Sequence, residues 1–214
     1  MVKEFFLGCQ WRGVQHTREV PVETQFQMIR DSGVFDYLDR LPPTDVLDEY
    51  IRCSQKYNIP LHTGTWYYQL GRDEPLLEEY MKNAARAGLK MHNIMIFTHH
   101  ADGHIVTDKE IVDCYCRTWE MGERLSVQPT FELHVNMWSE DFRRVAPVAE
   151  MVRAKGLPFN FTLDYSHCVF KMENPEEQER SGIKEDVESG RVVLDPFQQR
   201  SLCEQWLNMN MVVY

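Results

Sequence analysis

The chain has 214 residues, of which 43% are hydrophobic and 26% are charged, and its formal net charge is -10. This length suffices for one domain with a hydrophobic core, and the composition is typical of globular proteins. An acidic chain repels phosphate backbones, which argues against nucleic-acid binding. No apolar run is long enough to span a bilayer, and the N-terminus lacks the apolar core of a signal peptide. The six cysteines are scattered and are interpreted as reduced thiols, so we expect a cytoplasmic protein.

Short apolar runs, which predict strands, alternate along the chain with segments of helical periodicity. The predicted strands are residues 4–10, 34–38, 59–65, 90–97 and 209–214, together with two runs that end at Glu132 and Asp164. The predicted helices are residues 21–31, 43–57, 73–87, 107–125, 139–156 and 195–207.

Local signals refine this assignment. Gly88 predicts the end of the helix before it, and Thr107 with Glu110 predicts a capping box at the start of the next helix. Pro147 predicts a kink in the helix that contains it. Residues 173–191 are charged and carry two glycines, and a segment of this length is compatible with an active-site lid or with a disordered loop.

Strictly alternating strands and helices predict a parallel sheet with right-handed crossovers, in an α/β fold. No Gly-rich loop follows the first strand, and residues 8–13 do not form a dinucleotide fingerprint, so we favour a (β/α)8 TIM barrel over a doubly wound sheet. The sequence stops at Tyr214, inside the seventh predicted strand. We therefore expect residues 1–214 to be a single barrel domain, incomplete at the C-terminus, with about seven strands present.

Acidic and imidazole side chains follow the ends of the fifth and sixth predicted strands. Glu132 and His134 are two residues apart on one strand, so both point to the same side. Asp164 ends the next strand, and His167 follows it closely. Two carboxylates that converge in a barrel need a cation, and we favour a divalent metal over a structural ion pair with an arginine. Mn²⁺, Mg²⁺, Co²⁺ and Zn²⁺ are the candidate ions.

Aromatic residues and histidines fall just beyond other strand ends. Trp11, Trp66, Trp138 and His100 are placed there by the predicted elements. At a barrel mouth these rings would stack on a sugar, although ordinary packing at the rim explains the aromatic residues nearly as well. A solvated polar loop is the equal alternative for His100 and its neighbours.

Two short motifs resemble those of the xylose isomerase-like barrels, the sugar phosphate isomerase/epimerase group. They are Phe-Glu-Leu-His-Val-Asn at 131–136 and Leu-Asp-Tyr-Ser-His at 163–167. The resemblance implies that Glu132 and Asp164 bind metal and that Glu132 exchanges a proton next to a carbonyl. It implies that His167 binds substrate or lies close to the metal. We also expect His167 to take part in catalysis and His134 to bind substrate. The family completes its metal site with a histidine near the seventh strand and a glutamate from the eighth, and neither is found in this sequence.

The leading functional prediction is a metal-dependent sugar or polyol isomerase or epimerase of carbohydrate metabolism. A lyase of the same fold, either an inosose-type dehydratase or an enzyme that cleaves keto-C-glycosides, starts from the same proton transfer and remains the alternative. A non-catalytic barrel that serves as a partner subunit also remains open. The expected partner is a small sugar or polyol, without nucleic acid or membrane, and a homo-oligomer is an open alternative.

Overall fold

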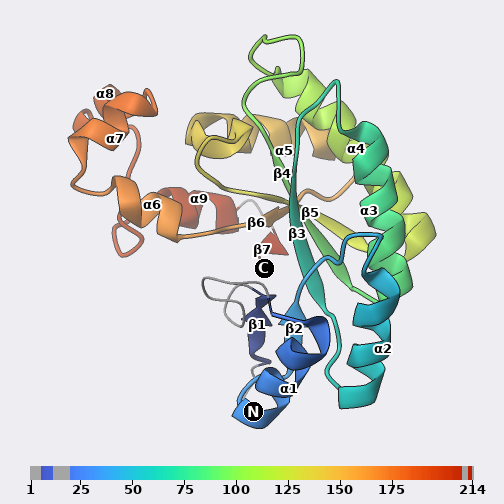
Figure 1. Ribbon diagram of the computed structural model, residues 1–214. Coiled ribbons are helices and arrows are strands. Elements are labelled where there is room, and N and C mark those ends of the chain that lie inside the picture. The colour runs from blue at the N-terminus through green and yellow to red at the C-terminus, as the bar shows by residue number, and fades with distance from the viewer. Residues whose placement is uncertain (1–5, 12–19, 209–211, 214) are drawn as a thin grey trace. The chain divides into compact units, whose positions relative to one another are not determined.

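Strands and helices alternate along most of the chain in the computed structural model, which describes residues 6–11, 20–208 and 212–213 (Figure 1). The strands are β1 (Gly8–Gln10), β2 (Tyr37–Asp39), β3 (Thr63–Tyr68), β4 (Met91–Ile96), β5 (Gln128–Glu132), β6 (Asn160–Thr162) and β7 (Val212–Val213). The helices are α1 (Val22–Ser32), α2 (Leu47–Tyr57), α3 (Glu74–Ala87), α4 (Asp108–Leu125), α5 (Val145–Ala154), α6 (Ser166–Lys171), α7 (Pro175–Arg180), α8 (Lys184–Glu188) and α9 (Leu202–Asn208). Two 3-10 turns, η2 (Trp138–Glu140) and η3 (Phe142–Arg144), precede α5.

The strands lie in chain order. β1 pairs with β2 in one sheet, and β3 to β7 form a second sheet in the order of their numbers. The backbone continues this order from β2 to β3, because the N–H of Leu38 donates to the carbonyl of Pro60 at 3.0 Å and that of Arg40 to Thr63 at 3.0 Å. The β1–β2, β5–β6 and β6–β7 pairs are parallel. Parallel strands in chain order, with helices between them, are the arrangement of an incomplete TIM barrel, as predicted.

The described residues form two compact units. The first unit comprises the described residues of 1–66, 75–93 and 119–129. Its helices α1 and α2 pack through Phe26, whose ring lies 6.0 Å from that of Tyr50 and 6.3 Å from that of Tyr57. α1 ends at Gly33, which takes a φ of 63°, a conformation that glycine adopts without steric cost.

The second unit comprises the described residues of 67–74, 94–118 and 130–214. Its core contains Tyr115 of α4, whose ring lies 5.1 Å from that of Phe131 and 4.9 Å from that of Phe159. Phe131 and Phe161 of the adjacent strands β5 and β6 are completely buried. These aromatic side chains fix the strands that carry the predicted acid and imidazole groups.

Most predicted elements are present, with ends that differ by a few residues. The capping box is confirmed, because the N–H of Thr107 donates to Oε2 of Glu110 at 2.8 Å and the N–H of Glu110 donates to Oγ1 of Thr107 at 3.3 Å. The stop at Gly88 is also confirmed, with a φ of 77°. The second strand begins later than predicted, at Tyr37. Residues 4–5, 209–211 and 214 of the first and last predicted strands lie outside the described residues.

One prediction about a helix is wrong, and one of two alternatives for a loop segment is excluded. Pro147 does not kink a long helix, because α5 begins at Val145 and places this proline in the first turn, where its missing N–H has no carbonyl partner to lose. Residues 173–191 are not a disordered loop but contain α7 and α8 (orange in Figure 1), and their role as an active-site lid stays a prediction. In addition, the predicted helix 195–207 starts only at Leu202.

Within the described residues, none of the helices combines the length and the apolar character needed to cross a bilayer. The six cysteines are free thiols, and five of them are buried.

Candidate active site

The carboxyl ends of β5 and β6 lie side by side. Glu132, the last residue of β5, pairs with Thr162, the last residue of β6, in parallel register. The ladder runs one residue further, because the N–H of Leu133 donates to the carbonyl of Thr162 at 3.0 Å. Asp164 follows two residues after β6. The two carboxylates therefore leave neighbouring strands at the same end of the sheet.

Four of the predicted site residues come together at these strand ends, all within the second unit. Glu132, His134 and His167 each offer one ligand atom, and these atoms lie within 4.8 Å of one another. The rings of His134 and His167 are 4.4 Å apart between centroids. Nε2 of His167 lies 3.4 Å from Oδ2 of Asp164. Glu132 is buried, with only 7% of the residue exposed.

A single buried hydroxyl holds the two residues of the β5 end in place. Oγ of Ser139 donates to the carbonyl of Glu132 at 2.6 Å and accepts the N–H of His134 at 3.3 Å. Asn136 then turns the chain with a φ of 62°, a conformation that asparagine tolerates better than most residues. Glu132 and His134 are therefore oriented by the short turn that leads into η2.

The imidazoles offer nitrogen donors to a cation. Nδ1 of His134 donates to the carbonyl of Val135 at 2.8 Å, so the lone pair of the neutral ring is on Nε2. Nε2 of His167 is buried and makes no hydrogen bond, and burial lowers the pKa of this histidine. A buried ring nitrogen without a hydrogen bond, next to two carboxylates, fits a divalent metal bound by mixed nitrogen and oxygen ligands.

Asp164 is fixed by the start of α6. Its Oδ1 accepts both the N–H of Ser166 at 3.0 Å and the Oγ hydroxyl of Ser166 at 2.6 Å. Because these bonds occupy Oδ1, Oδ2 is the oxygen that faces His167. The predicted carboxylate is thus oriented before any ligand binds.

The remaining predicted substrate contacts have other surroundings. Trp138 is 1% exposed, and it borders a cavity of about 630 Å³ in the second unit. In the first unit, the ring of Trp11 lies 4.0 Å from the guanidinium carbon of Arg40, and Trp66 packs edge-on against Tyr80. His100 belongs to a second group of histidines and a carboxylate, apart from the ligand cluster at Glu132. Contact of these four side chains with substrate stays a prediction.

Two polar features of the second unit were not predicted from the sequence. Lys171 is completely buried and pairs with Glu140 of η2. Asp102 lies between two histidines of the turn after β4. The alternate spacing of His100, Asp102 and His104 is the signal that could have indicated the second feature, whereas nothing in the local sequence indicates that Lys171 is buried.

No protein-family model and no curated protein sequence matches the chain. Solved structures, in contrast, match the chain. The 3-keto-D-glucoside 4-epimerase YcjR from E. coli has a TM-score of 0.59 at 14% identity, over 99% of this chain and 91% of that one. IolI protein with a bound zinc atom has a TM-score of 0.57 at 14% identity, over 76% of this chain and 64% of that one. A sugar phosphate isomerase/epimerase from Parabacteroides distasonis has a TM-score of 0.54 at 14% identity, over 83% of this chain and 72% of that one.

These likenesses confirm the predicted resemblance to xylose isomerase-like barrels at the level of the fold. The chain spans less than two thirds of IolI protein and most of YcjR. Fold alone does not fix a reaction, so any activity has to be argued from the cluster at the ends of β5 and β6.

Proposed function

We propose that this protein is a divalent-metal-dependent enzyme that isomerises or epimerises a small sugar or polyol by proton transfer next to a carbonyl. The observation that carries the proposal is the convergence of Glu132, His134 and His167 within 4.8 Å, with Asp164 beside His167. The fold that the chain shares with an epimerase and an isomerase/epimerase supports the substrate class.

Glu132 and Asp164 would hold the metal, with His167 at or next to it. Bringing two carboxylates into a poorly solvated site costs free energy unless positive charge is present between them. Glu132 is buried, and both carboxylates lie near the same imidazole. A divalent ion supplies, when bound, the charge that stabilises the developing oxyanion of the substrate.

The side chains of this chain perform the proton transfer in this proposal. In an isomerisation Glu132 takes the proton from the carbon next to the carbonyl and returns it to the neighbouring carbon, whereas an epimerisation also needs a proton donor on the opposite face of the reacting carbon. Nε2 of His134 and the ring of His167 orient substrate hydroxyl groups, since both rings lie beside the carboxylate. The tether of Ser139 keeps Glu132 and His134 at a fixed separation during this exchange.

Substitution of the two carboxylates tests the proposal. Glu132→Gln should lose one equivalent of bound metal and should abolish exchange of solvent deuterium into a ketose, an inosose or a keto-glycoside. Asp164→Asn should lose the same equivalent. Glu150→Gln, at an exposed position of α5, is the matched control and should behave as wild type.

Elemental analysis gives the metal content, and NMR detects deuterium at the reacting carbon. Full metal content and full exchange in Glu132→Gln, with the same unfolding curve as wild type, would show that this glutamate is only a structural carboxylate.

A further inference from the structure

The turn between β4 and α4 is held by its own backbone. His99 and Ile105 form an antiparallel bridge. Inside it, the N–H of His100 donates to the carbonyl of His104 at 2.9 Å, and the N–H of Gly103 donates back to the carbonyl of His100 at 2.9 Å. Because the backbone is closed in this way, the side chains of His100, Asp102 and His104 project from a fixed turn.

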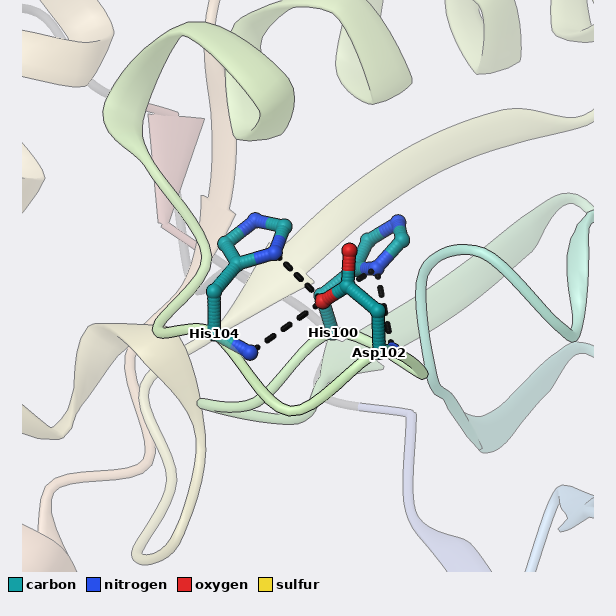
Figure 2. Close-up of side chains that lie close together, drawn as sticks. All are labelled: His100, Asp102 and His104. Atoms are coloured by element: carbon teal, nitrogen blue, oxygen red, sulfur yellow. Dashed lines mark hydrogen bonds and ion pairs between the residues drawn. The ribbon is translucent and has the colours of Figure 1, made fainter.

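Three of these side chains converge (Figure 2). Oδ1 of Asp102 lies 3.1 Å from Nδ1 of His100 and 2.5 Å from Nδ1 of His104. The two imidazole rings are stacked, with 4.6 Å between their centroids. One ligand atom from each residue lies within 4.8 Å of the other two. The spacing allows one cation to reach all three residues.

The hydrogen bonds around His100 leave a conflict that a cation resolves. Nδ1 of His100 accepts the N–H of Asp102 at 3.4 Å, which requires a lone pair on that nitrogen. The same nitrogen faces Oδ1 of Asp102 at 3.1 Å, which also carries lone pairs. Either a proton on that nitrogen or a metal ion between the nitrogen and the carboxylate removes their repulsion.

The ring of His104 is oriented from its other side. Its Nε2 lies 3.1 Å from both carboxylate oxygens of Glu110, and its Nδ1 hydrogen-bonds Oδ1 of Asp102 at 2.5 Å, so a metal ion at Nδ1 would replace the proton shared with Asp102. Glu110 is in turn fixed by the capping box with Thr107. A carboxylate that holds the second nitrogen of a histidine is the usual support of a metal-binding imidazole.

Packing outside the turn fixes His100. Its ring lies against the backbone of Gly71, where an added Cβ would sit 2.3 Å from Cε1 of the imidazole. Gly71 also has a φ of 83°, so a side chain is disfavoured there for two reasons. The His100 side chain is 22% exposed, and its ring therefore has little freedom to leave the cluster.

We propose that Nδ1 of His100, a carboxylate oxygen of Asp102 and Nδ1 of His104 bind one divalent transition-metal ion, with Glu110 as the residue that positions His104. Two imidazole nitrogens and one carboxylate favour Zn²⁺, Co²⁺, Ni²⁺ or Cu²⁺ over Mg²⁺ and Ca²⁺, which prefer oxygen ligands. Asp102 and His104 are largely exposed, so water completes the coordination. The site uses none of the residues at the ends of β5 and β6 and does not depend on the proposed enzymatic activity.

Zinc binding to the full chain tests the proposal, by equilibrium dialysis and elemental analysis in the Glu132→Gln background. That background removes the other candidate metal site. One equivalent of Zn²⁺ should bind, and His104→Ala and Asp102→Asn should each abolish it. Glu110→Gln should weaken it about 10- to 100-fold. His99→Ala, which removes an exposed imidazole from the same turn, is the matched control and should bind as its parent does.

A second measurement needs no substitution. In nitrogen-15 NMR spectra of wild-type histidine side chains, Zn²⁺ should shift Nδ1 of His100 and His104 and leave His99 unchanged. Undiminished zinc binding in His104→Ala and Asp102→Asn, or the absence of these shifts in the wild type, would overturn the site. Neither result would bear on the proton exchange assigned to Glu132, which is read from deuterium incorporation.

Discussion

Nζ of Lys171 lies 3.1 Å from Oε1 of Glu140, and the lysine side chain is completely buried. Oε2 of the same glutamate accepts the N–H of Asn136 at 2.6 Å. Glu140 therefore joins α6, which carries His167, to the turn that follows His134. The pair links the two strand-end segments of the candidate site.

Lys171→Ala should destabilise the protein by about 3–5 kcal/mol, because it leaves a largely buried carboxylate without its counter-charge. Lys184→Ala is the control. It breaks a pair with Glu179 whose side chains are 39% and 72% exposed, and exposed pairs contribute about 0–1 kcal/mol. Urea unfolding measures both. Equal losses in the two variants would mean that the burial of Lys171 has no energetic consequence.

The hydroxyl of Tyr115 supports the start of β6. It accepts the N–H of Asn160 at 2.7 Å and donates to the carbonyl of Pro158 at 2.9 Å. Tyr115→Phe leaves these backbone groups without their partner and should cost about 1–3 kcal/mol. Tyr57→Phe removes a hydroxyl that donates to the partly exposed Glu23. This change should cost less, because water can replace the lost hydrogen bond. Thermal or urea unfolding gives the comparison, and a neutral Tyr115→Phe would contradict this role.

His92 should make stability depend on pH. Its ring is completely buried, Nδ1 donates to the carbonyl of Gly64 at 2.9 Å, and burial lowers its pKa to about 4. The unfolded chain binds this proton below a pKa of about 6.5. Stability from this residue is therefore complete above pH 6.5 or so and is lost as the pH falls towards 4, by roughly 3 kcal/mol in all.

His92→Asn keeps a donor near Gly64 and removes the titrating ring. The difference in unfolding free energy between pH 7.5 and pH 4.5 should then be smaller than in the wild type. The same pH dependence in both proteins would assign it to other groups.

The sequence predicted those elements whose signals are local. α3 and its end at Gly88, and the capping box of Thr107 and Glu110, depend on side chains within a few residues of one another. α7 had such a signal too, and it was missed. Asn174 accepts the N–H of Glu177, and Pro175 occupies the first turn, which is the usual start of a helix.

The candidate site was only partly predictable, because its geometry depends on strand pairing. That Glu132 ends one strand and Asp164 follows the next could be read from the apolar runs. The meeting of the His134 and His167 rings requires the register of Glu132 with Thr162 and the position of α6. Register is set by packing over the whole sheet rather than by the residues of one strand.

The chain order of the strands also affects how the protein can fold during its synthesis. From β3 to β7, each strand pairs with the one synthesised just before it, and β2 joins β3 in the same way. Pairing with the preceding strand closes the shortest loop open to a parallel strand, because a crossover segment must lie between the two. Because synthesis proceeds at about 5–20 residues per second from the N-terminus, the partner of each new strand has already left the ribosome. The sheet can therefore grow during translation, one strand at a time.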